Sequence, residues 1–317
     1  MKKFVLLYWF VVALAFATAV QNLPEWAYVT RTPDLKDPVD DGSLRHVPDS
    51  SRAWTLTQLQ DFFFAPDWHP EDHPPLPEIV AHGSKPEVFA CGFCHRADGP
   101  GGPENAALAG LSQAYIVQQM ADFKSGARRS ALPERKPAAS MVAVAQAATD
   151  AEVASAAAYF SSLKPRKTIT VIETDLVPKT HVVGWILAPV ADQTKEPIGR
   201  RIIETPKDVE QFESRDARSE FIAYVPTGSV GRGAALVKTG GDGTTVQCNL
   251  CHGPDLKGLG AVPGIAGRSP SYIVRQLIDF QRGKRTSAAG LPMKGVVANL
   301  NQDDFVSIAA YTASLAP

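Results

Sequence analysis

Four stretches of the chain, which form two similar pairs, are predicted to be helices because each begins with a residue that can cap a helix. In the first pair, over residues 112–126 and 269–283, a serine can cap the start of a helix and a glycine can end it. In the second pair, over residues 149–163 and 301–315, a capping residue again opens the stretch, and Thr149 with Glu152 has the pattern of a capping box. The two parts of the chain that carry these stretches are therefore predicted to be small and all-helical.

A different pattern precedes and separates these parts. Residues 20–75 hold many prolines and an excess of acidic side chains, which favours long loops and one short helix near 56–64. Four β-branched or alternating runs, bounded by prolines, are typical of short strands: 168–174, 181–190, 200–204 and 221–225. The expected fold class is therefore mainly α, with a short β-containing linker and a loop-rich N-terminal extension.

The chain opens with two lysines, an apolar run over residues 4–16 and small residues at 17–19. This order is that of a secretory signal peptide, so residues 1–19 are predicted to be cleaved and the protein to be exported. The alternative is an uncleaved membrane anchor, because the uncharged stretch 4–20 lies at the lower limit for spanning a bilayer. Contact with a membrane is expected only in that case.

An internal repeat at an offset of 157 residues organises the rest of the chain. Cys91-Gly92-Phe93-Cys94-His95 recurs as Cys248-Asn249-Leu250-Cys251-His252, and matched residues continue without a gap to position 130 of the first copy. The first copy then carries about five extra residues, and the register resumes at offset 152. The predicted division is a signal peptide, an extension, two units of about 90 residues and the linker between them: 1–19, 20–75, 76–164, 229–317 and 165–228.

Composition narrows the class of protein. The chain has 317 residues, of which 44% are hydrophobic, and its formal net charge is −1. The nearly balanced charge and a pI near 6.7 do not point to a nucleic-acid partner, so none is expected. Four cysteines are too few to serve as the main scaffold of a chain this long. Since units of 90 residues are small for self-sufficient cores, something besides apolar packing should support them.

The repeated Cys-x-x-Cys-His sequence is the signature of covalent c-type haem attachment. Two thiols at i and i+3 lie on one side of a helical turn and can form thioethers to the haem vinyl groups. The adjacent histidine then points its imidazole at the iron. Redox-active dithiols would need a strand-to-helix setting, and a zinc site built from both pairs leaves the two histidines unexplained. We expect two haem c groups, held by Cys91, Cys94, Cys248 and Cys251.

His95 and His252 are the expected proximal iron ligands. The distal ligand must come from elsewhere in each unit, and His or Met are the usual choices. Met141 and Met293 match each other in the repeat, each follows a flexible stretch that could form a loop over the haem, and they are the predicted distal ligands. Met120 is interpreted as a core residue, because leucine stands at its matched position.

Histidines are the alternative distal ligands in the first unit. His69 and His73 lie in a proline-rich stretch, and His82 precedes Gly83. Any of the three could replace Met141 in a bis-histidine site. Surface or capping roles are the ordinary interpretation for these histidines.

These motifs resemble the class I c-type cytochromes, and most closely the dihaem, two-domain group related to the c-four cytochromes. The resemblance covers about 180 residues and rests on both Cys-x-x-Cys-His sequences, both predicted distal methionines and the matched run that begins at Tyr115 and Tyr272. It implies a small helical bundle around each haem, with first and last helices crossing, and His/Met iron in a periplasmic electron-transfer protein.

The resemblance also shows where this chain differs. In the family a proline carbonyl commonly supports the proximal histidine. Pro263 suits that role, whereas Ala106 stands at the matched place in the first unit. Tyr159 and Tyr311 occupy the family's aromatic position on the last helix, where a core role is expected. Compact members lack both the extension and the linker.

The expected function is electron transfer in the bacterial periplasm, as a free carrier or as the cytochrome subunit of a dehydrogenase. Redox partner proteins are expected, such as a periplasmic dehydrogenase, a terminal oxidase or another cytochrome. A six-coordinate iron has no open position for substrate, which favours a carrier over an enzyme. The alternative is a dihaem peroxidase or thiosulfate-type oxidoreductase with one labile distal ligand. A sensor or assembly factor would need an output domain, which the sequence does not show.

Charge is uneven along the chain, being acidic in the extension and basic in the second unit. A basic face could steer an acidic partner or dock the acidic extension: Lys257, Arg282, Lys284, Arg285 and Lys294. The alternative is an ordinary solvated surface. Arg128 and Arg285, which match in the repeat, could instead stabilise haem propionates.

Overall fold

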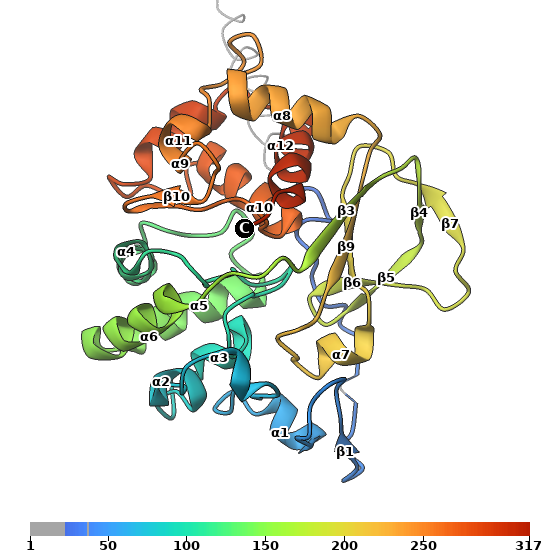
Figure 1. The fold of residues 1–317 in the computed structure, drawn as a ribbon, viewed down its shortest axis with the longest axis vertical. Helices are drawn as coiled ribbons and strands as arrows, with labels where there is room; N and C mark the ends of the chain where they lie inside the picture. The colour runs from blue at the N-terminus through green and yellow to red at the C-terminus, as the bar shows by residue number, and fades with distance from the viewer. Residues whose placement is uncertain (1–22, 37) are drawn as a thin grey trace, which may run out of the picture.

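A computed structural model describes residues 23–36 and 38–317. The predicted signal peptide, residues 1–19, lies outside the described residues. In Figure 1, two helical units lie one above the other, and the segment between them in sequence stands beside both. We refer to residues 76–164 as unit one, to 229–317 as unit two, to 165–228 as the insert and to the described residues before 76 as the extension. These boundaries remain predictions.

Unit one consists of helices that follow one another with short connections. They are α2 (Glu78–Ala81), α3 (Cys91–His95), α4 (Gln113–Ser125), α5 (Lys136–Ala147) and α6 (Asp150–Ser162). Its core brings α4 and α6 together through buried residues such as Ile116, Ala157 and Phe160. Both predicted helices of this unit are present. Ser112 caps α4, Gly126 ends it in a left-handed conformation, and Thr149 with Glu152 forms the capping box of α6.

Unit two repeats this order with a longer first helix. Its elements are α8 (Ser229–Thr239), α9 (Asn249–His252), β10 (Gly258–Leu259), β11 (Val262–Pro263), α10 (Pro270–Gln281), α11 (Leu291–Val297) and α12 (Gln302–Ser314). Ser269 caps α10, and Asn301 opens α12 with a capping box, as the sequence predicts. The two short β strands, which were not predicted, form an antiparallel pair.

The first helix differs between the two units. In unit two, α8 crosses α12 so closely that a Cβ on Gly233 would lie 2.0 Å from the carbonyl oxygen of Ser307. In unit one, the matched stretch contains only the four-residue α2, which begins immediately after Pro77. Prolines at 74, 75 and 77 remove backbone donors and restrict the residues before them, so a long helix cannot form there. The implied crossing of first and last helices is therefore complete in unit two alone.

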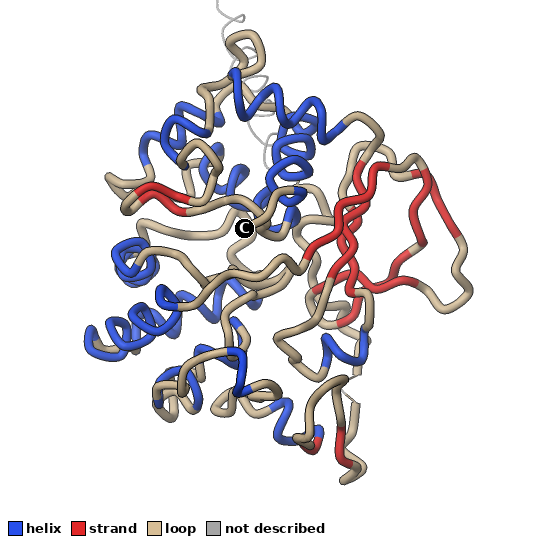
Figure 2. Tube along the Cα trace, in the orientation of Figure 1, coloured by secondary structure: helices blue, strands red, loops and turns tan. Residues whose placement is uncertain are grey.

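The insert is structured and contains most of the strands in the described residues (Figure 2). Its main sheet has the order β3-β9-β8, in which β3 (Ile169–Glu173) runs parallel and β8 (Ile203–Pro206) antiparallel to β9 (Phe221–Val225). The other elements are β4 (Leu176–Pro178), β5 (Thr180–Val183), β6 (Ile186–Pro189), β7 (Lys195–Pro197) and α7 (Val209–Glu213). The predicted runs are strands, with 181–190 forming the β5–β6 hairpin, whereas β4 and β7 were missed.

The main sheet shares its core with unit two. Buried residues of β9, such as Ala223 and Val225, belong to the same cluster as Val237 of α8 and Ile308 of α12. Ala27 and Tyr28 of the extension join this cluster. Removing these apolar groups from water is the main stabilisation that connects insert and unit two, at roughly 25 cal/mol per Å² of buried apolar surface.

The extension runs from unit two to unit one and carries β1 (Leu44–Arg45), β2 (Trp54–Thr55), α1 (Leu56–Gln60) and the 3-10 helix η1 (Pro70–Asp72). It is anchored to the insert, because the indole nitrogen of Trp68 donates to the carbonyl of Ser214 at 2.8 Å. Arg218 of the insert pairs with both Glu71 and Asp72, at 2.9 and 2.8 Å. In the described part of the chain, no helix is long and apolar enough to cross a membrane.

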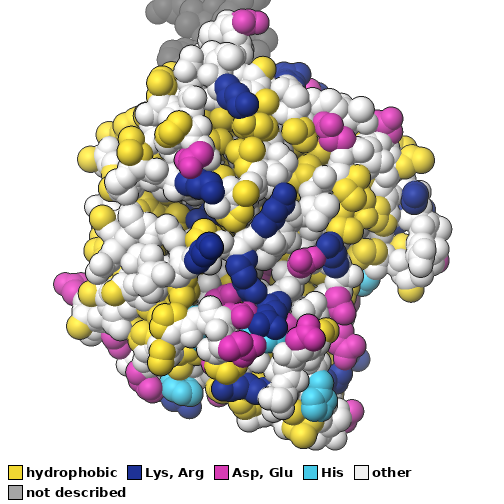
Figure 3. All heavy atoms as spheres, in the orientation of Figure 1, with side chains coloured by type: hydrophobic (Ala, Val, Ile, Leu, Met, Phe, Trp, Pro, Cys, Tyr) yellow, Lys and Arg dark blue, Asp and Glu magenta, His cyan; other side chains and the backbone are white. Residues whose placement is uncertain are grey.

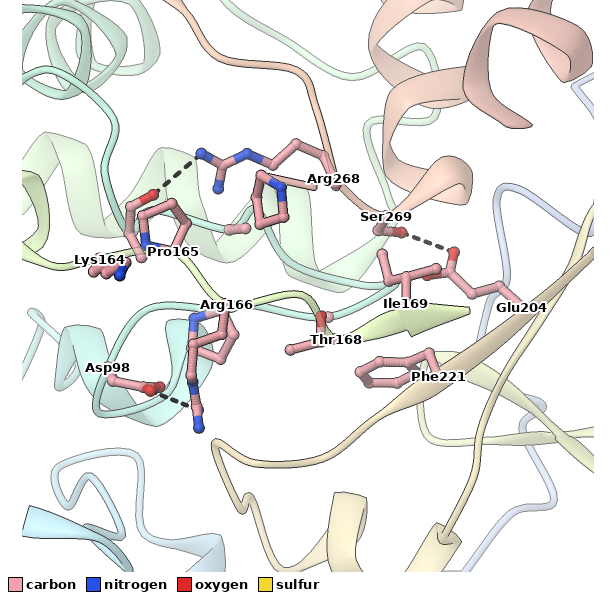
Figure 4. A pocket seen from close by; sticks show the side chains of 16 residues that line it. Asp98, Lys164, Pro165, Arg166, Thr168, Ile169, Glu204, Phe221, Arg268 and Ser269 are labelled. Carbon is pink, nitrogen blue, oxygen red and sulfur yellow. Dashed lines mark hydrogen bonds and ion pairs between the residues drawn. The ribbon is translucent and has the colours of Figure 1, made fainter. Parts of the chain in front are cut away.

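The start of the insert touches both units at one junction, which Figure 4 shows closely. Arg166 pairs with Asp98 of unit one at 2.6 Å. Arg268 of unit two donates to the carbonyl of Ala109 at 3.1 Å, and the Ser269 hydroxyl donates to Glu204 of the insert at 2.8 Å. Unit one, insert and unit two are therefore joined by directional contacts as well as by apolar packing.

Candidate haem sites

Each Cys-x-x-Cys-His sequence forms a single helical turn. The first turn is α3, and the second is α9 with Cys248 as its N-cap. In both, the residue after the histidine has a positive φ, 68° at Arg96 and 85° at Gly253, so the helix stops immediately after the histidine. The chain then turns away, and the imidazole stays at the end of a rigid turn.

Both histidines are oriented by a backbone carbonyl. The Nδ1 atom of His95 donates to the carbonyl of Ala106 at 2.8 Å, and that of His252 donates to the carbonyl of Pro263 at 2.7 Å. Since the carbonyl can only accept, the proton lies on Nδ1 and Nε2 keeps its lone pair. Burial lowers the pKa of both histidines, which favours the neutral form that ligates metals. Proline at the supporting position is therefore not required, because alanine presents the same carbonyl.

The four cysteines are unpaired thiols beside these histidines. Burial raises the pKa of Cys91 to about 12 and that of Cys248 to about 11. A reactive dithiol needs a lowered pKa, so the surroundings do not fit redox-active thiols. Among residues 23–36 and 38–317, no three His, Cys, Asp or Glu side chains gather in a way that could hold a metal ion, so the zinc alternative has no site there either.

A continuous cavity of about 1090 Å³ reaches from one Cys-x-x-Cys-His turn to the other. Ordinary small-ligand pockets measure about 300–1,000 Å³, so this one is large enough for more than a single drug-sized molecule. The predicted site residues all line it: Cys91, Cys94, His95, Met141, Cys248, Cys251, His252 and Met293. The arrangement fits two large apolar groups, one against each turn.

Both predicted distal methionines lie on helices rather than on loops. Met141 belongs to α5, and Met293 belongs to the short α11. The flexible stretches before them end at Arg135 and Gly290, where each helix begins, so the methionines are held more rigidly than the sequence suggested. Met120 of α4 also lines the cavity, but Leu277 lines it at the matched position of α10. A wall residue that can be leucine in one unit fits packing rather than ligation.

The competing histidines lie elsewhere. His69 is buried against Asp216, with Nε2 3.1 Å from the carboxylate, and His73 pairs with Asp67 at 3.2 Å. His82 ends α2 and is exposed. None of the three is among the described residues that line the cavity. Met141 and Met120 therefore line the same cavity as His95, whereas the three histidines do not, and the assignment of Met141 as distal ligand stays a prediction.

The two units meet through matched residues of α4 and α10. Arg128 donates to Gln119 of its own unit and to Tyr272 and Gln276 of the other, at 2.8–2.9 Å. Arg285 donates in the same way to Gln276 and Gln119. The segments that follow α4 and α10 form an isolated antiparallel β-bridge between Arg128 and Arg285, with the Arg129 amide donating to the carbonyl of Lys284 at 2.8 Å. The interface therefore has an approximate twofold symmetry that follows the repeat. Gln119 and Gln276 are related by the same offset of 157 residues, so the repeat in the sequence could have pointed to them.

This interface holds arginines that form no salt bridge, although the carboxylate of Asp279 interacts electrostatically with three of them, Arg128, Arg275 and Arg285. Arg128 and Arg285 are 8% and 7% exposed, line the cavity, and form no ion pair with any described carboxylate. Arg135 and Arg275 are also buried in the cavity wall, and Arg268 lies there half-buried. Burial lowers the pKa of Arg268 to about 10. The described lining holds more guanidinium groups than carboxylates, which are Glu104, Glu152 and Asp279, and this excess favours an anionic group in the cavity.

The predicted basic face is only partly correct. Lys257, Arg282, Lys284 and Lys294 are exposed, but Arg285 is buried and points into the interface. The acidic extension does not dock on this face. Its carboxylates at 71 and 72 pair instead with arginines of the insert.

Tyr159 and Tyr311 contribute to packing, as expected. The Tyr159 hydroxyl donates to the carbonyl of Ala97 at 2.8 Å, and burial raises its pKa. Tyr311 lies half-buried under the ammonium group of Lys238. The sequence analysis missed three residues that line the cavity near the first Cys-x-x-Cys-His turn. Phe62 comes from the extension, Arg215 from the insert and Glu104 from unit one itself. No motif marks them.

Comparison with known proteins shows which proteins this chain is similar to. Residues 83–164 match the model of the cytochrome c family. Cytochrome c4 of Azotobacter vinelandii is 28% identical over 72% of this chain and 86% of its own length. The thiosulfate dehydrogenase electron acceptor of Stutzerimonas stutzeri is 25% identical over 74% of this chain and 82% of its own length.

Among solved structures, reduced recombinant cytochrome c4 from Pseudomonas stutzeri aligns with a TM-score of 0.47 at 24% identity, covering 71% of this chain and 93% of that one. The chain resembles the dihaem class I c-type cytochromes of the cytochrome c4 group. It is a haem-binding protein of electron transport.

Proposed function

We propose, from the resemblance to the cytochrome c4 group, that this chain carries two covalent haem c groups and passes electrons between proteins in the periplasm. The supporting observation is the single cavity with a Cys-x-x-Cys-His turn at each end and a carbonyl-oriented histidine in both. Haem c supplies reversible one-electron chemistry at iron. The chain's own residues attach it, orient its ligands and exclude water.

In unit one, Cys91 and Cys94 would attach the haem, and His95 and Met141 would ligate the iron. In unit two, Cys248, Cys251, His252 and Met293 would have the same roles. Hydrogen bonds from both imidazoles to carbonyls make Nε2 a better donor to iron. Met as second ligand raises the potential relative to two histidines, which suits a carrier.

The buried arginines would balance the carboxylates of the haem propionates. Arg128, Arg135, Arg275 and Arg285 are buried in the cavity wall, Arg268 lies there half-buried, and none of the five forms a salt bridge with a described carboxylate. Propionates are carboxylates, with which these guanidinium groups could pair. We expect Arg285→Gln to change the midpoint potential of at least one haem, because a compensating charge is lost.

The proposal of a periplasmic location is supported by the basic and apolar opening of residues 1–19. Cell fractionation of the full chain tests it, with haem-stained protein expected in the periplasmic fraction. A dehydrogenase is a suitable electron donor, since one relative is named as the electron acceptor of thiosulfate dehydrogenase.

Haem counting tests the central proposal. The purified protein should contain two haems per chain in a pyridine haemochrome assay. Cys91→Ser with Cys94→Ser should reduce the number to one, and so should Cys248→Ser with Cys251→Ser. One haem in the unmodified protein would contradict the dihaem assignment. Rapid binding of carbon monoxide by the native reduced protein would favour an enzyme with an open iron position instead.

A further inference from the structure

The two matched haem faces differ in what covers them. In unit two, four large apolar side chains are 50–63% exposed around the second Cys-x-x-Cys-His turn: Val246, Leu250, Leu259 and Leu291. Val246 itself lines the cavity, and Leu250 lies between the two cysteines. Leu259 and Leu291 are on β10 and α11, whose neighbouring residues Val262 and Met293 line the same cavity.

In unit one, the chain itself covers most of the matched face, although the outer ring of this cover, Phe62, is 48% exposed. Phe93 stands where Leu250 stands, and it is 2% exposed against 63% for Leu250. Phe62 of the extension packs on Phe93 and on Phe89, with ring centroids 4.7 Å apart in both pairs. Phe89 in turn is the counterpart of Val246.

The insert completes this cover. The Arg215 guanidinium stacks on the Phe93 ring at 3.5 Å from its centroid. It also donates to the carbonyls of Phe93 and Leu59, at 3.2 and 2.8 Å, so that one side chain ties unit one, extension and insert together. The backbone adds a bond from the Ala90 amide to the carbonyl of Phe62 at 2.9 Å.

The close approach of the extension depends on a glycine. A Cβ on Gly92 would lie 2.8 Å from the Cβ of Ala65 and 3.0 Å from the carbonyl of Val80. The matched residue of unit two is Asn249, whose side chain would not fit under such a cover. The repeat has therefore diverged at the position that decides whether the face can be closed. We call the segment 59–65 together with Arg215 the cap.

Charge distinguishes the open face as well. Unit two, which carries the open face, has more exposed cations than exposed acids: Arg232, Lys238, Lys257, Arg282, Lys284 and Lys294 against Asp242 and Asp255. Figure 3 shows apolar side chains gathered in the region where α9 and α11 lie in Figure 1, with basic side chains beside them. An apolar centre with a net basic surround fits a partner with an apolar centre and an acidic surround.

We infer that the cap closes unit one to partners, so that an acidic redox protein docks only on the open face of unit two. The inference rests on the proposed function. Electrons then reach or leave the first site through the second site. The cap occupies, within the molecule, the place that a partner occupies on unit two.

Docking can be mapped with hexacyanochromate(III), a redox-inert trivalent anion that broadens nearby amide signals in NMR spectra. With the haem-loaded full chain, we expect broadening at residues 246–259 and 291–294 and none at 59–65 or 89–93. Lys257→Gln with Lys294→Gln should remove most of it. Equal broadening at the cap would overturn the inference.

Kinetics provide a second measurement. Stopped-flow oxidation of the reduced protein by ferricyanide should show one concentration-dependent phase. Leu250→Glu should slow that phase about tenfold, because it places a like charge in the path of the anion. Val117→Glu is the matched control, because Val117 is also exposed and apolar but does not line the cavity; it should leave the rate within about twofold.

The cap itself is tested by Phe62→Ala, which should add a second concentration-dependent phase. Urea unfolding of the Phe62→Ala variant beside the unmodified protein checks that the added phase is not general unfolding. Two concentration-dependent phases of similar rate in the unmodified protein, or equal effects of Leu250→Glu and Val117→Glu, would overturn the inference. The proposed function would survive that result, since it fails only if two redox-active haems are not found.

Discussion

At the scale of single residues, comparing the two copies of the repeat distinguishes the predicted iron ligands from residues that only line the cavity. His95 and His252 have the same bond to a carbonyl eleven positions later, although that position holds alanine in one unit and proline in the other. Backbone geometry, not the side chain, carries the function there. Met120 and Leu277 show the opposite case. Methionine could ligate iron, but the residue at the matched position of the repeat is leucine, which could not.

This separation leads to a test of the distal ligands. Met141→Leu should lower the potential of one haem and open a coordination position that binds carbon monoxide, because leucine offers no lone pair to iron. Met293→Leu should do the same for the other haem. Met120→Leu is the control and should change neither property. Carbon monoxide binding by the Met120 variant alone would exchange the roles of Met120 and Met141.

The Cys-x-x-Cys-His sequences could be recognised as candidate haem sites because covalent attachment requires a fixed spacing. The helices that carry the two methionines could not, since the flexible stretch before each methionine gave no sign of where a helix begins. Phe62 and Arg215 were also out of reach, because they act over 31 and 122 positions on Phe93 and have no motif. Single-sequence patterns describe neighbours along the chain, whereas these contacts depend on the tertiary fold.

At the scale of elements, the crossing of α8 and α12 depends on one small residue. Gly233→Ala should destabilise the protein by about 1–3 kcal/mol, because the new Cβ would collide with the backbone of Ser307. Gly231→Ala on the same helix has no atom within 4 Å of its new Cβ and should be neutral or stabilising by up to about 1 kcal/mol. Urea unfolding measures both. Equal effects would mean that helix propensity, not the crossing, decides.

The insert holds the start of α10 through Glu204. This carboxylate accepts from the Ser269 hydroxyl at 2.8 Å and from the Ser271 amide at 3.1 Å, and burial raises its pKa. Glu204→Ala should cost about 1–3 kcal/mol of unfolding free energy, since two buried donors lose their acceptor.

Glu204→Gln keeps an acceptor at that position, so it should cost less than the alanine variant. The comparison on the surface is Glu196→Ala, which breaks a half-exposed pair with Arg201 and should cost about 0–1 kcal/mol. A loss at Glu204 no larger than at Glu196 would show that the insert does not position α10.

Helices and strands were predictable to the extent that their ends carry local signals. The capping residues Ser112, Thr149, Ser269 and Asn301 all act as caps in the structure. The sharing of a core between the insert and unit two was not predictable, because β-branched runs indicate strands without indicating what they pack against.

At the scale of the whole molecule, Asp279 connects three segments. It accepts from the Ala131 amide of unit one at 2.7 Å and from the hydroxyl of Tyr28 of the extension at 3.3 Å. Burial raises the pKa of Asp279 from 3.8 to about 6. The folded chain therefore holds this proton more tightly than the unfolded chain, and the resulting stabilisation is complete below about pH 4 and lost as the pH rises through 6.

The test compares the protein with its Asp279→Asn variant between pH 4 and 7. The difference in unfolding free energy should change by at most about 1.4 kcal/mol for each pH unit, with the unmodified protein losing stability relative to the variant as the pH rises. Subtracting the unfolding free energy of the variant from that of the unmodified protein at each pH cancels the contribution of the other titrating groups. A difference that does not depend on pH would mean that Asp279 is ionised in the folded state.

The hydrogen bonds that Arg215 and Arg285 make to unit one have a consequence for the order in which the protein is assembled. The first site needs Arg215 and Arg285 in addition to its own unit, and both follow residue 164 in the chain. When residues 76–164 have been synthesised, Cys91 and Cys94 exist but the cap lacks Arg215, and Gln119 lacks its partner across the interface. Under the proposed function, the first haem would be attached through a side that later closes, since the contacts of unit one with Arg215 and Arg285 can form only once those residues have been made.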